Sequence, residues 1–196
     1  LAEKSLNENQ FHSDAETKFK TIIPLKMAQE LSRILKEEKE KVGIYFNNNQ
    51  ILGKSENTEI VSRLINGEFP DYEPIIPQSL QTEITLSKDE LINALKLAGS
   101  FADRLSEVRI IVKENIKSIE VFSSTQGLGE NRYLIPAKIK GNPIEIVFNW
   151  RFLLDGLKSL TAENIFLGLN GEDRPAILKS VNDTSYFYVL MPIKAG

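Results

Sequence analysis

The sequence predicts an α+β protein in which one unit, a strand followed by a helix and three further strands, occurs three times. Two observations support this prediction. Apolar residues recur at helical spacing in three places, and each of these places is followed by three short runs typical of strands. The chain has 196 residues, of which 41% are hydrophobic, so it can bury a substantial core in one or two domains.

The first unit is expected between residues 19 and 65. A short strand at 19–23 leads to Pro24, a residue favoured at the first position of a helix. Met27, Leu31 and Ile34 then follow at helical spacing, with Leu35 beside them. Residues that favour turns separate the three strands that complete the unit, at 42–46, 51–54 and 59–65.

The second unit begins with a strand at 83–86. Ser87 and Glu90 have the spacing of a capping box, in which each side chain accepts a hydrogen bond from the other residue's backbone N–H. A helix is therefore predicted from this point to about Ala102, with Leu91, Leu95 and Ala98 on its apolar face. The three strands of this unit are expected at 108–113, 118–123 and 132–139.

The third unit repeats the order. A strand at 144–148 leads to Asn149, a residue type that often caps a helix, and the helix is expected to reach Leu160. Its three strands are predicted at 165–169, 176–180 and 186–191. The repeat is therefore visible within the sequence itself.

A proline-rich connector separates the first and second units. Pro70, Pro74 and Pro77 each fix one backbone angle and lack an N–H donor, so the connector is stiff and cannot pair as a central strand. Its other residues include Phe69 and Ile76 rather than only polar ones. A stiff apolar connector favours the interpretation that it is buried between two bodies.

Composition excludes several classes of function. The absence of cysteine excludes a disulfide framework and a thiolate metal site, and the single histidine, His12, lies in a polar segment that is expected to be a loop. No run approaches the roughly 20 apolar residues that a membrane-spanning helix needs, so we expect a soluble, cytoplasmic protein without membrane contact. The net charge of −3 means that any DNA contact must be local.

An enzyme is one alternative, as a small hydrolase or transferase. Gly127 and Gly129 begin a glycine pattern, but Arg132 stands where a dinucleotide fingerprint requires glycine. Glu172 and Asp173 are adjacent carboxylates in a predicted hairpin turn, where neighbouring side chains diverge. We therefore predict no catalytic residue, metal or cofactor. A peptide-binding scaffold without a DNA role is the other alternative.

Three segments resemble the bacterial sliding clamp, the family of the DNA polymerase III beta subunit. Residues 62–72 (Ser-Arg-Leu-Ile-Asn-Gly-Glu-Phe-Pro-Asp-Tyr) resemble the connector between its second and third domains. Residues 148–157 (Phe-Asn-Trp-Arg-Phe-Leu-Leu-Asp-Gly-Leu) are similar to a helix start of the family, and residues 188–193 (Tyr-Val-Leu-Met-Pro-Ile) to its C-terminal tail. The matches occur in the family's order and span nearly the whole chain.

The resemblance implies the DNA clamp fold, with helices on the inner face of a ring and antiparallel sheets outside. Each clamp domain contains two of the repeated units, so three units imply the C-terminal half of the middle domain with the connector at 1–79, and the C-terminal domain at 80–196. Residues 1–6 would be the end of a strand, and the N-terminal domain and the first half of the middle domain would be absent.

The resemblance also implies a processivity factor without a catalytic site of its own. The full-length protein would form a homodimeric ring around double-stranded DNA. It would tether the replicative DNA polymerase, the clamp loader and other proteins that carry a clamp-binding motif. This fragment is expected to bind such peptides weakly and not to close a ring.

The implied sites fall into three groups. Lys26 and Arg33 are two helical turns apart, as are Arg151 and Lys158, so each pair points the same way. With Lys96 they would face DNA, although a solvated helix face is an equally simple interpretation. Ser100 and Phe101 would belong to the ring interface. The peptide groove would be formed by Leu1, Pro70, Pro74, Ile75, Ile76, Asn149, Phe152, Pro175, Val189, Leu190, Met191, Pro192 and Ile193.

Two positions depart from the family's pattern. Pro74 stands where clamps often have a basic residue, and Lys194 begins an ending that differs from the family's usual one. Both departures bear on how tightly a peptide would bind and leave the expected groove in place.

Overall fold

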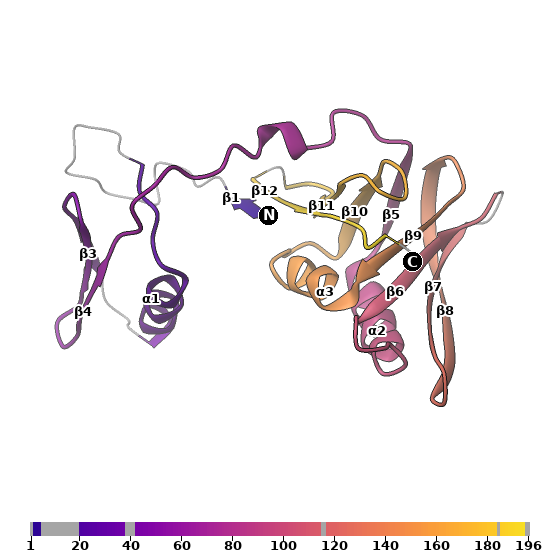
Figure 1. The fold of residues 1–196 in the computed structure, drawn as a ribbon, viewed down its shortest axis with the longest axis horizontal. Coiled ribbons are helices and arrows are strands. Elements are labelled where there is room, and N and C mark those ends of the chain that lie inside the picture. Colours follow the sequence, from indigo (N-terminus) through magenta and orange to yellow (C-terminus); the bar gives the residue numbers. More distant parts are fainter. Residues whose placement is uncertain (1, 5–19, 38–41, 115–116, 184, 195–196) are drawn as a thin grey trace. The chain divides into compact units, whose positions relative to one another are not determined.

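The computed structural model describes residues 2–4, 20–37, 42–114, 117–183 and 185–194 (Figure 1). The chain divides into two compact units. We call Phe11–Asp71 the N-terminal unit, and Tyr72–Gly196 together with Leu1–Gln10 the C-terminal unit.

The N-terminal unit packs one helix against a small antiparallel sheet. Helix α1 (Leu25–Glu37) precedes strands β2 (Gly43–Phe46), β3 (Gln50–Lys54) and β4 (Glu59–Arg63), which lie in that order in the sheet. Met27, Leu31 and Ile51 form its buried cluster. Of the strand predicted at 19–23, the described residues 20–23 show a single bridge, between Ile22 and Ile65.

The chain turns at Gly67, shortly before the first proline of the connector. Gly67 has a φ of 143°, a backbone conformation that glycine adopts far more readily than other residues. The 3₁₀ helix η2 (Glu73–Ile75) follows, with Pro74 in its first turn.

The C-terminal unit contains the second and third repeats. The second consists of β5 (Thr82–Ser87), α2 (Lys88–Gly99), β6 (Glu107–Val112), β7 (Ser118–Thr125) and β8 (Gly129–Gly141). The third consists of β9 (Ile144–Asn149), α3 (Trp150–Lys158), β10 (Asn164–Leu169), β11 (Ala176–Ser180) and β12 (Tyr186–Leu190). In the described residues the strand order is β1-β12-β11-β10-β5-β8-β7-β6-β9, where β1 is Ala2–Lys4.

The two repeats interlock through their first strands. Strand β5 pairs with β10 of the other repeat, and β9 pairs in the same way with β6. At the start of each helix the same backbone bond forms: Lys88 N donates to Glu163 O at 2.8 Å, and Trp150 N donates to Ser106 O at 3.0 Å. The repeat seen in the sequence is therefore also a repeat in space.

Helices α2 and α3 contact each other and pack against the strands (Figure 1). Leu91, Leu95, Leu153 and Leu157 are fully buried in the shared core. A Cβ atom placed on Gly99 of α2 would lie 2.6 Å from the Trp150 ring. Glycine at this position therefore allows the end of α2 to approach the start of α3 closely.

The predicted α+β class and the order of elements are confirmed, whereas some boundaries differ. Helix α2 ends at Gly99 rather than near Ala102, because the N–H groups of residues 100–102 bond to carbonyls three positions back instead of four. Strand β8 is longer than predicted because its first part pairs with β7 and its last part with β5. Ser87 Oγ accepts from Glu90 N at 3.4 Å, which is one half of the predicted capping box.

Candidate functional site

The start of α3 displays an apolar side chain held by a well-formed cap. Asn149 Oδ1 accepts a hydrogen bond from Arg151 N at 3.0 Å, and its Nδ2 donates to Leu105 O at 3.3 Å. The cap satisfies a backbone donor at the helix start and ties the helix to the loop before β6. Phe152, in the first turn, is 58% exposed.

The chain beyond β12 bonds to β9, the strand that leads into this helix. Ile193 N donates to Val147 O at 2.8 Å, so the tail is placed next to the end of β9. Val189 and Leu190 are buried, whereas Met191 is 56% exposed. Because Ala176 pairs with Leu190, the preceding residue Pro175 lies beside the start of the tail.

Eight of the thirteen predicted groove residues lie at the start of α3, before β11, and along the end of β12 and the tail that follows it. We call this set the α3–tail surface; it consists of Asn149, Phe152, Pro175, Val189, Leu190, Met191, Pro192 and Ile193. Pro74, Ile75 and Ile76 lie in the connector, at η2 and directly after it. Pro70 belongs to the N-terminal unit, and Leu1 lies outside the described residues.

The Tyr188 ring packs against α3, next to the α3–tail surface. A Cβ atom on Gly156 would lie 2.6 Å from Tyr188 Cδ1, so the ring rests directly on the backbone of α3. Burial raises the pKa of the Tyr188 hydroxyl, and the nearby charge of Asp155 raises it further. The ring therefore stays neutral and acts as an apolar support for the helix.

The loop before β6 was not among the site residues predicted from the sequence, although it lies next to the Asn149 cap. Leu105 is 62% exposed next to the Asn149 cap, and Ser106 has a φ of 60°, which is unusual for a residue other than glycine. Asp103 shapes this loop, since its Oδ1 accepts from Leu105 N at 2.8 Å and its O accepts from Ser106 N at 3.0 Å. Asp103 is a residue type that forms such turns, and it was the available signal in the sequence.

Arg151 folds back onto the same loop. Its Nε donates to Ser106 Oγ at 3.2 Å, and its guanidinium lies 4.6 Å from the centre of the Trp150 ring. These contacts hold the side chain close to the start of α3.

The other predicted DNA-facing residues lie on exposed helix faces. Lys96 and Lys158 are exposed in the last turns of α2 and α3. Lys158 Nζ lies 3.2 Å from Asp155 Oδ1. In α1, Lys26 is exposed and Arg33 Nε lies 2.9 Å from Glu30 Oε2.

The predicted ring-interface residues follow α2. Ser100 is exposed and caps the C-terminus of the helix. Phe101 is half-buried, and its carbonyl accepts a hydrogen bond from Thr125 Oγ1 at 2.6 Å.

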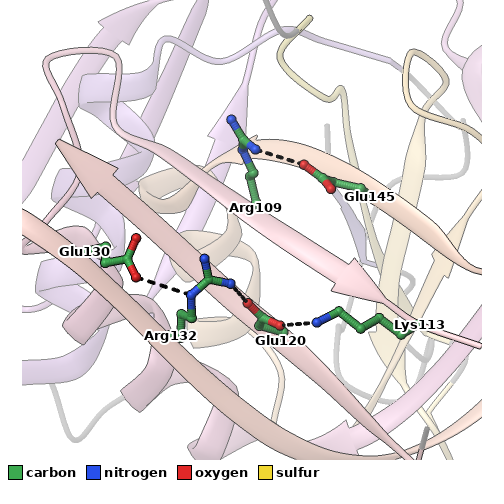
Figure 2. Close-up of polar contacts among 6 residues, drawn as sticks. All are labelled: Arg109, Lys113, Glu120, Glu130, Arg132 and Glu145. Atoms are coloured by element: carbon green, nitrogen blue, oxygen red, sulfur yellow. Dashed lines mark hydrogen bonds and ion pairs between the residues drawn. The ribbon is translucent and has the colours of Figure 1, made fainter. Parts of the chain in front are cut away.

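Charged side chains on β6, β7, β8 and β9, and on the residue after β6, are linked by hydrogen bonds and ion pairs (Figure 2). The buried carboxylate of Glu120 binds Lys113 and Arg132, and Arg132 also reaches Glu130 at 3.5 Å. Arg109 binds Glu145 separately at 3.0 Å. Each charge is neutralised by a neighbour, an arrangement that stabilises a sheet rather than one that activates a nucleophile.

Neither a cluster of metal-binding side chains nor a membrane-spanning helix is present among the described residues. Within them no group of three or more histidine, cysteine, aspartate and glutamate side chains could hold a metal ion. The helices in the described part of the chain are also too short or too polar to cross a membrane.

Comparison with known proteins identifies the relatives of this chain. Family models of the DNA polymerase III beta subunit match residues 4–71 with its central domain and residues 73–194 with its C-terminal domain. The beta sliding clamp of Bacillus subtilis is 32% identical over 179 residues, which cover 90% of this chain and 47% of that protein. The beta sliding clamp of Synechococcus elongatus is 26% identical, covering 91% of this chain and 48% of that protein.

Solved structures agree with these matches. The crystal structure of the DNA polymerase sliding clamp from Bacillus subtilis superposes with a TM-score of 0.84 at 32% identity, covering 90% of this chain and 47% of that one. This chain therefore spans about half the length of the relatives it matches.

Proposed function

Because the chain belongs to the DNA polymerase III beta subunit family, we propose that it is the C-terminal portion of a sliding clamp, which encircles duplex DNA and keeps the replicative polymerase attached to it. The observation that carries this proposal is the succession of the family's central and C-terminal domain matches along one chain. The repeated βαβββ unit, with α2 and α3 in contact, supports it independently.

The domain assignment follows from the repeat. We propose that residues 1–79 are the C-terminal half of the middle clamp domain with the connector, and that residues 80–196 form the C-terminal domain. The second and third repeats share one core of buried side chains, as expected for a complete domain. The first repeat has its own small core.

DNA would be held through phosphate contacts from the exposed helix faces. Lys26, Arg33, Lys96, Arg151 and Lys158 are the proposed contacts. Contacts to phosphates carry no sequence information, so they allow a protein to slide along DNA, and salt weakens them. The ion pairs of Arg33 and Lys158 are exposed, so exchanging these partners for phosphates costs little.

Partner proteins would dock on the α3–tail surface with a short linear peptide. Phe152 and Met191 offer exposed apolar contacts, and the flexible Met191 side chain can adapt to different peptides. Leu105 adds a third exposed apolar residue beside the Asn149 cap. The polymerase, the clamp loader and other proteins with the motif would share this surface.

The full-length protein would act as a homodimeric ring, with Ser100 and Phe101 at its interface, and without catalysis of its own. Lys113 and Arg132 neutralise the Glu120 carboxylate, which makes it a poor nucleophile. This pairing supports a tethering role over a hydrolase.

A peptide-binding measurement tests the proposal. A fluorescently labelled clamp-binding peptide from the polymerase of the same organism is titrated with the chain and with Phe152→Ala and Met191→Ala variants. Each substitution is expected to weaken binding about tenfold, since each removes a large apolar contact. Leu134→Ala, equally exposed but on β8, is the control and should bind like the parent chain. Equal binding by all four proteins would overturn the assignment of the surface.

DNA binding separates the clamp from a scaffold that binds only peptides. A scaffold would bind the peptide and leave duplex DNA unbound at low salt, whereas a clamp fragment retains a weak, salt-sensitive affinity for DNA.

A further inference from the structure

A recess lies where β5 leads into α2. Strand β5 pairs with β8 as far as Leu86 opposite Ala137, and with β10 as far as Ser87 opposite Asn164. Beyond Ser87 the chain turns into the helix, so no strand fills the space between β8 and β10. The result is a cavity of about 890 Å³, which we call the β5 cavity.

The size of the β5 cavity suits a ligand. Pockets that hold drug-sized ligands are roughly 300–1,000 Å³. The β5 cavity also occupies the place in the second repeat that the α3–tail surface occupies in the third, since both lie at the junction of a first strand and its helix. It differs from that surface because its lining includes charged side chains, whereas the residues of the α3–tail surface are mainly apolar.

The walls of the β5 cavity carry opposite charges. Lys117 and Lys138 come from the β7–β8 side, whereas Glu90 and Glu163 come from α2 and the segment before β10. Leu86 and Ala137 contribute apolar surface between them. A ligand across the cavity would therefore meet cations on one side and carboxylates on the other.

The four charged side chains have no hydrogen bond or ion pair with any residue in the described part of the chain. By contrast, Lys140, two positions from Lys138 on β8, lies 3.6 Å from Glu83. A ligand that meets these lysines and glutamates would therefore displace no such partner.

We propose that the β5 cavity binds an extended peptide segment that carries both an acidic and a basic side chain. The acidic side chain lies against Lys117 and Lys138, and the basic one against Glu90 and Glu163. A ligand with charges of one sign only would be repelled by one of the two walls. This proposal rests on the C-terminal unit alone and goes beyond the clamp function.

The test is a selection followed by charge reversal. Random octapeptides displayed on phage are selected against the 196-residue chain, and enriched peptides are measured with Lys117→Glu/Lys138→Glu, Lys140→Glu and Phe152→Ala variants. Lys117, Lys138 and Lys140 are exposed, so the variants should fold, which melting by circular dichroism checks.

The expected result is at least one enriched peptide with both charges that binds the double variant at least tenfold more weakly. Its binding to Lys140→Glu and Phe152→Ala is unchanged, and replacing its acidic residue by lysine restores binding to the double variant. Peptides that lose binding only with Phe152→Ala occupy the α3–tail surface. If every enriched peptide behaves in that way, or if none depends on Lys117 and Lys138, the proposal is wrong.

Discussion

Arg132 donates a hydrogen bond from Nη1 to Glu120 Oε1 at 2.6 Å, across the paired strands β7 and β8 (Figure 2). The other oxygen of Glu120 accepts from Lys113 Nζ at 2.9 Å. The lysine hydrogen bond is the largest cause, and the arginine a further one, of a pKa for Glu120 below its ordinary value of 4.5. The carboxylate is therefore more stable in the folded chain than in the unfolded one.

Glu120→Gln is expected to lower the free energy of unfolding at pH 7 by about 1–2 kcal/mol, because the amide cannot neutralise two cations. The lowered pKa gives the sign of the pH dependence. The stabilisation is present above the ordinary glutamate pKa and is lost as the pH falls through the lowered value. Urea unfolding of both proteins from pH 7 to pH 3 should show the difference shrinking below about pH 4.5.

Glu145→Gln is the matched control for this prediction. Glu145 also binds an arginine, Arg109, but both side chains are about half exposed. The substitution should cost less than about 0.5 kcal/mol because exposed ion pairs contribute little. An equal loss from both variants would contradict the role assigned to the buried position of Glu120.

Gly156→Ala should destabilise the C-terminal unit although alanine favours helices. The added Cβ would lie 2.6 Å from Tyr188 Cδ1, so the ring or the helix must shift. Overpacking of this kind costs about 1–3 kcal/mol, which exceeds the gain of about 1 kcal/mol in helix propensity. Thermal unfolding of the single variant and of Gly156→Ala/Tyr188→Leu measures the effect. A smaller loss in the double variant would show that the ring is the obstacle.

The helix starts could be predicted from the sequence because they depend on local chemistry. Ser87 and Asn149 cap their helices as expected, since a cap requires only one side chain and a backbone N–H two or three residues ahead. The length of β8 could not be predicted, because its last residues extend the sheet through pairing with β5, which lies some 50 residues earlier in the sequence.

The residues of the candidate site also fall into two groups, those that the sequence indicated and those that depend on long-range contacts. Phe152 and Met191 were found through a resemblance to a family pattern, and the structure shows both side chains exposed. Leu105 was missed because its exposure depends on the unusual backbone of Ser106 and on the long-range hydrogen bond from Asn149. The contact of Arg151 with Ser106 was missed for the same reason, since it joins residues 45 positions apart.

Asn149→Ala should cost more stability than Ser87→Ala. Asn149 makes two hydrogen bonds, at 3.0 and 3.3 Å, whereas Ser87 Oγ accepts one from Glu90 N at 3.4 Å. Loss of a cap costs about 0.5–2 kcal/mol, and the bond to Leu105 O adds to it. Chemical denaturation of the two variants compares these costs. The greater loss from Ser87→Ala would show that the bond to the loop contributes nothing.

The last prediction concerns the basic ends of α2 and α3. If Lys96 and Lys158 contact phosphates, replacing both with glutamate should weaken binding of a short labelled duplex, measured by fluorescence anisotropy. It should also reduce the slope of log affinity against log salt by about 2, because each phosphate contact contributes about 0.9. Lys140→Glu/Lys179→Glu makes the same charge change at other positions; Lys140 pairs with Glu83, and Lys179 lies over the Phe166 ring. A more negative net charge alone would lower affinity equally in both double variants, whereas direct contact with DNA lowers it only in the first. Equal salt slopes for the two variants would therefore remove these lysines from the proposed DNA-facing surface.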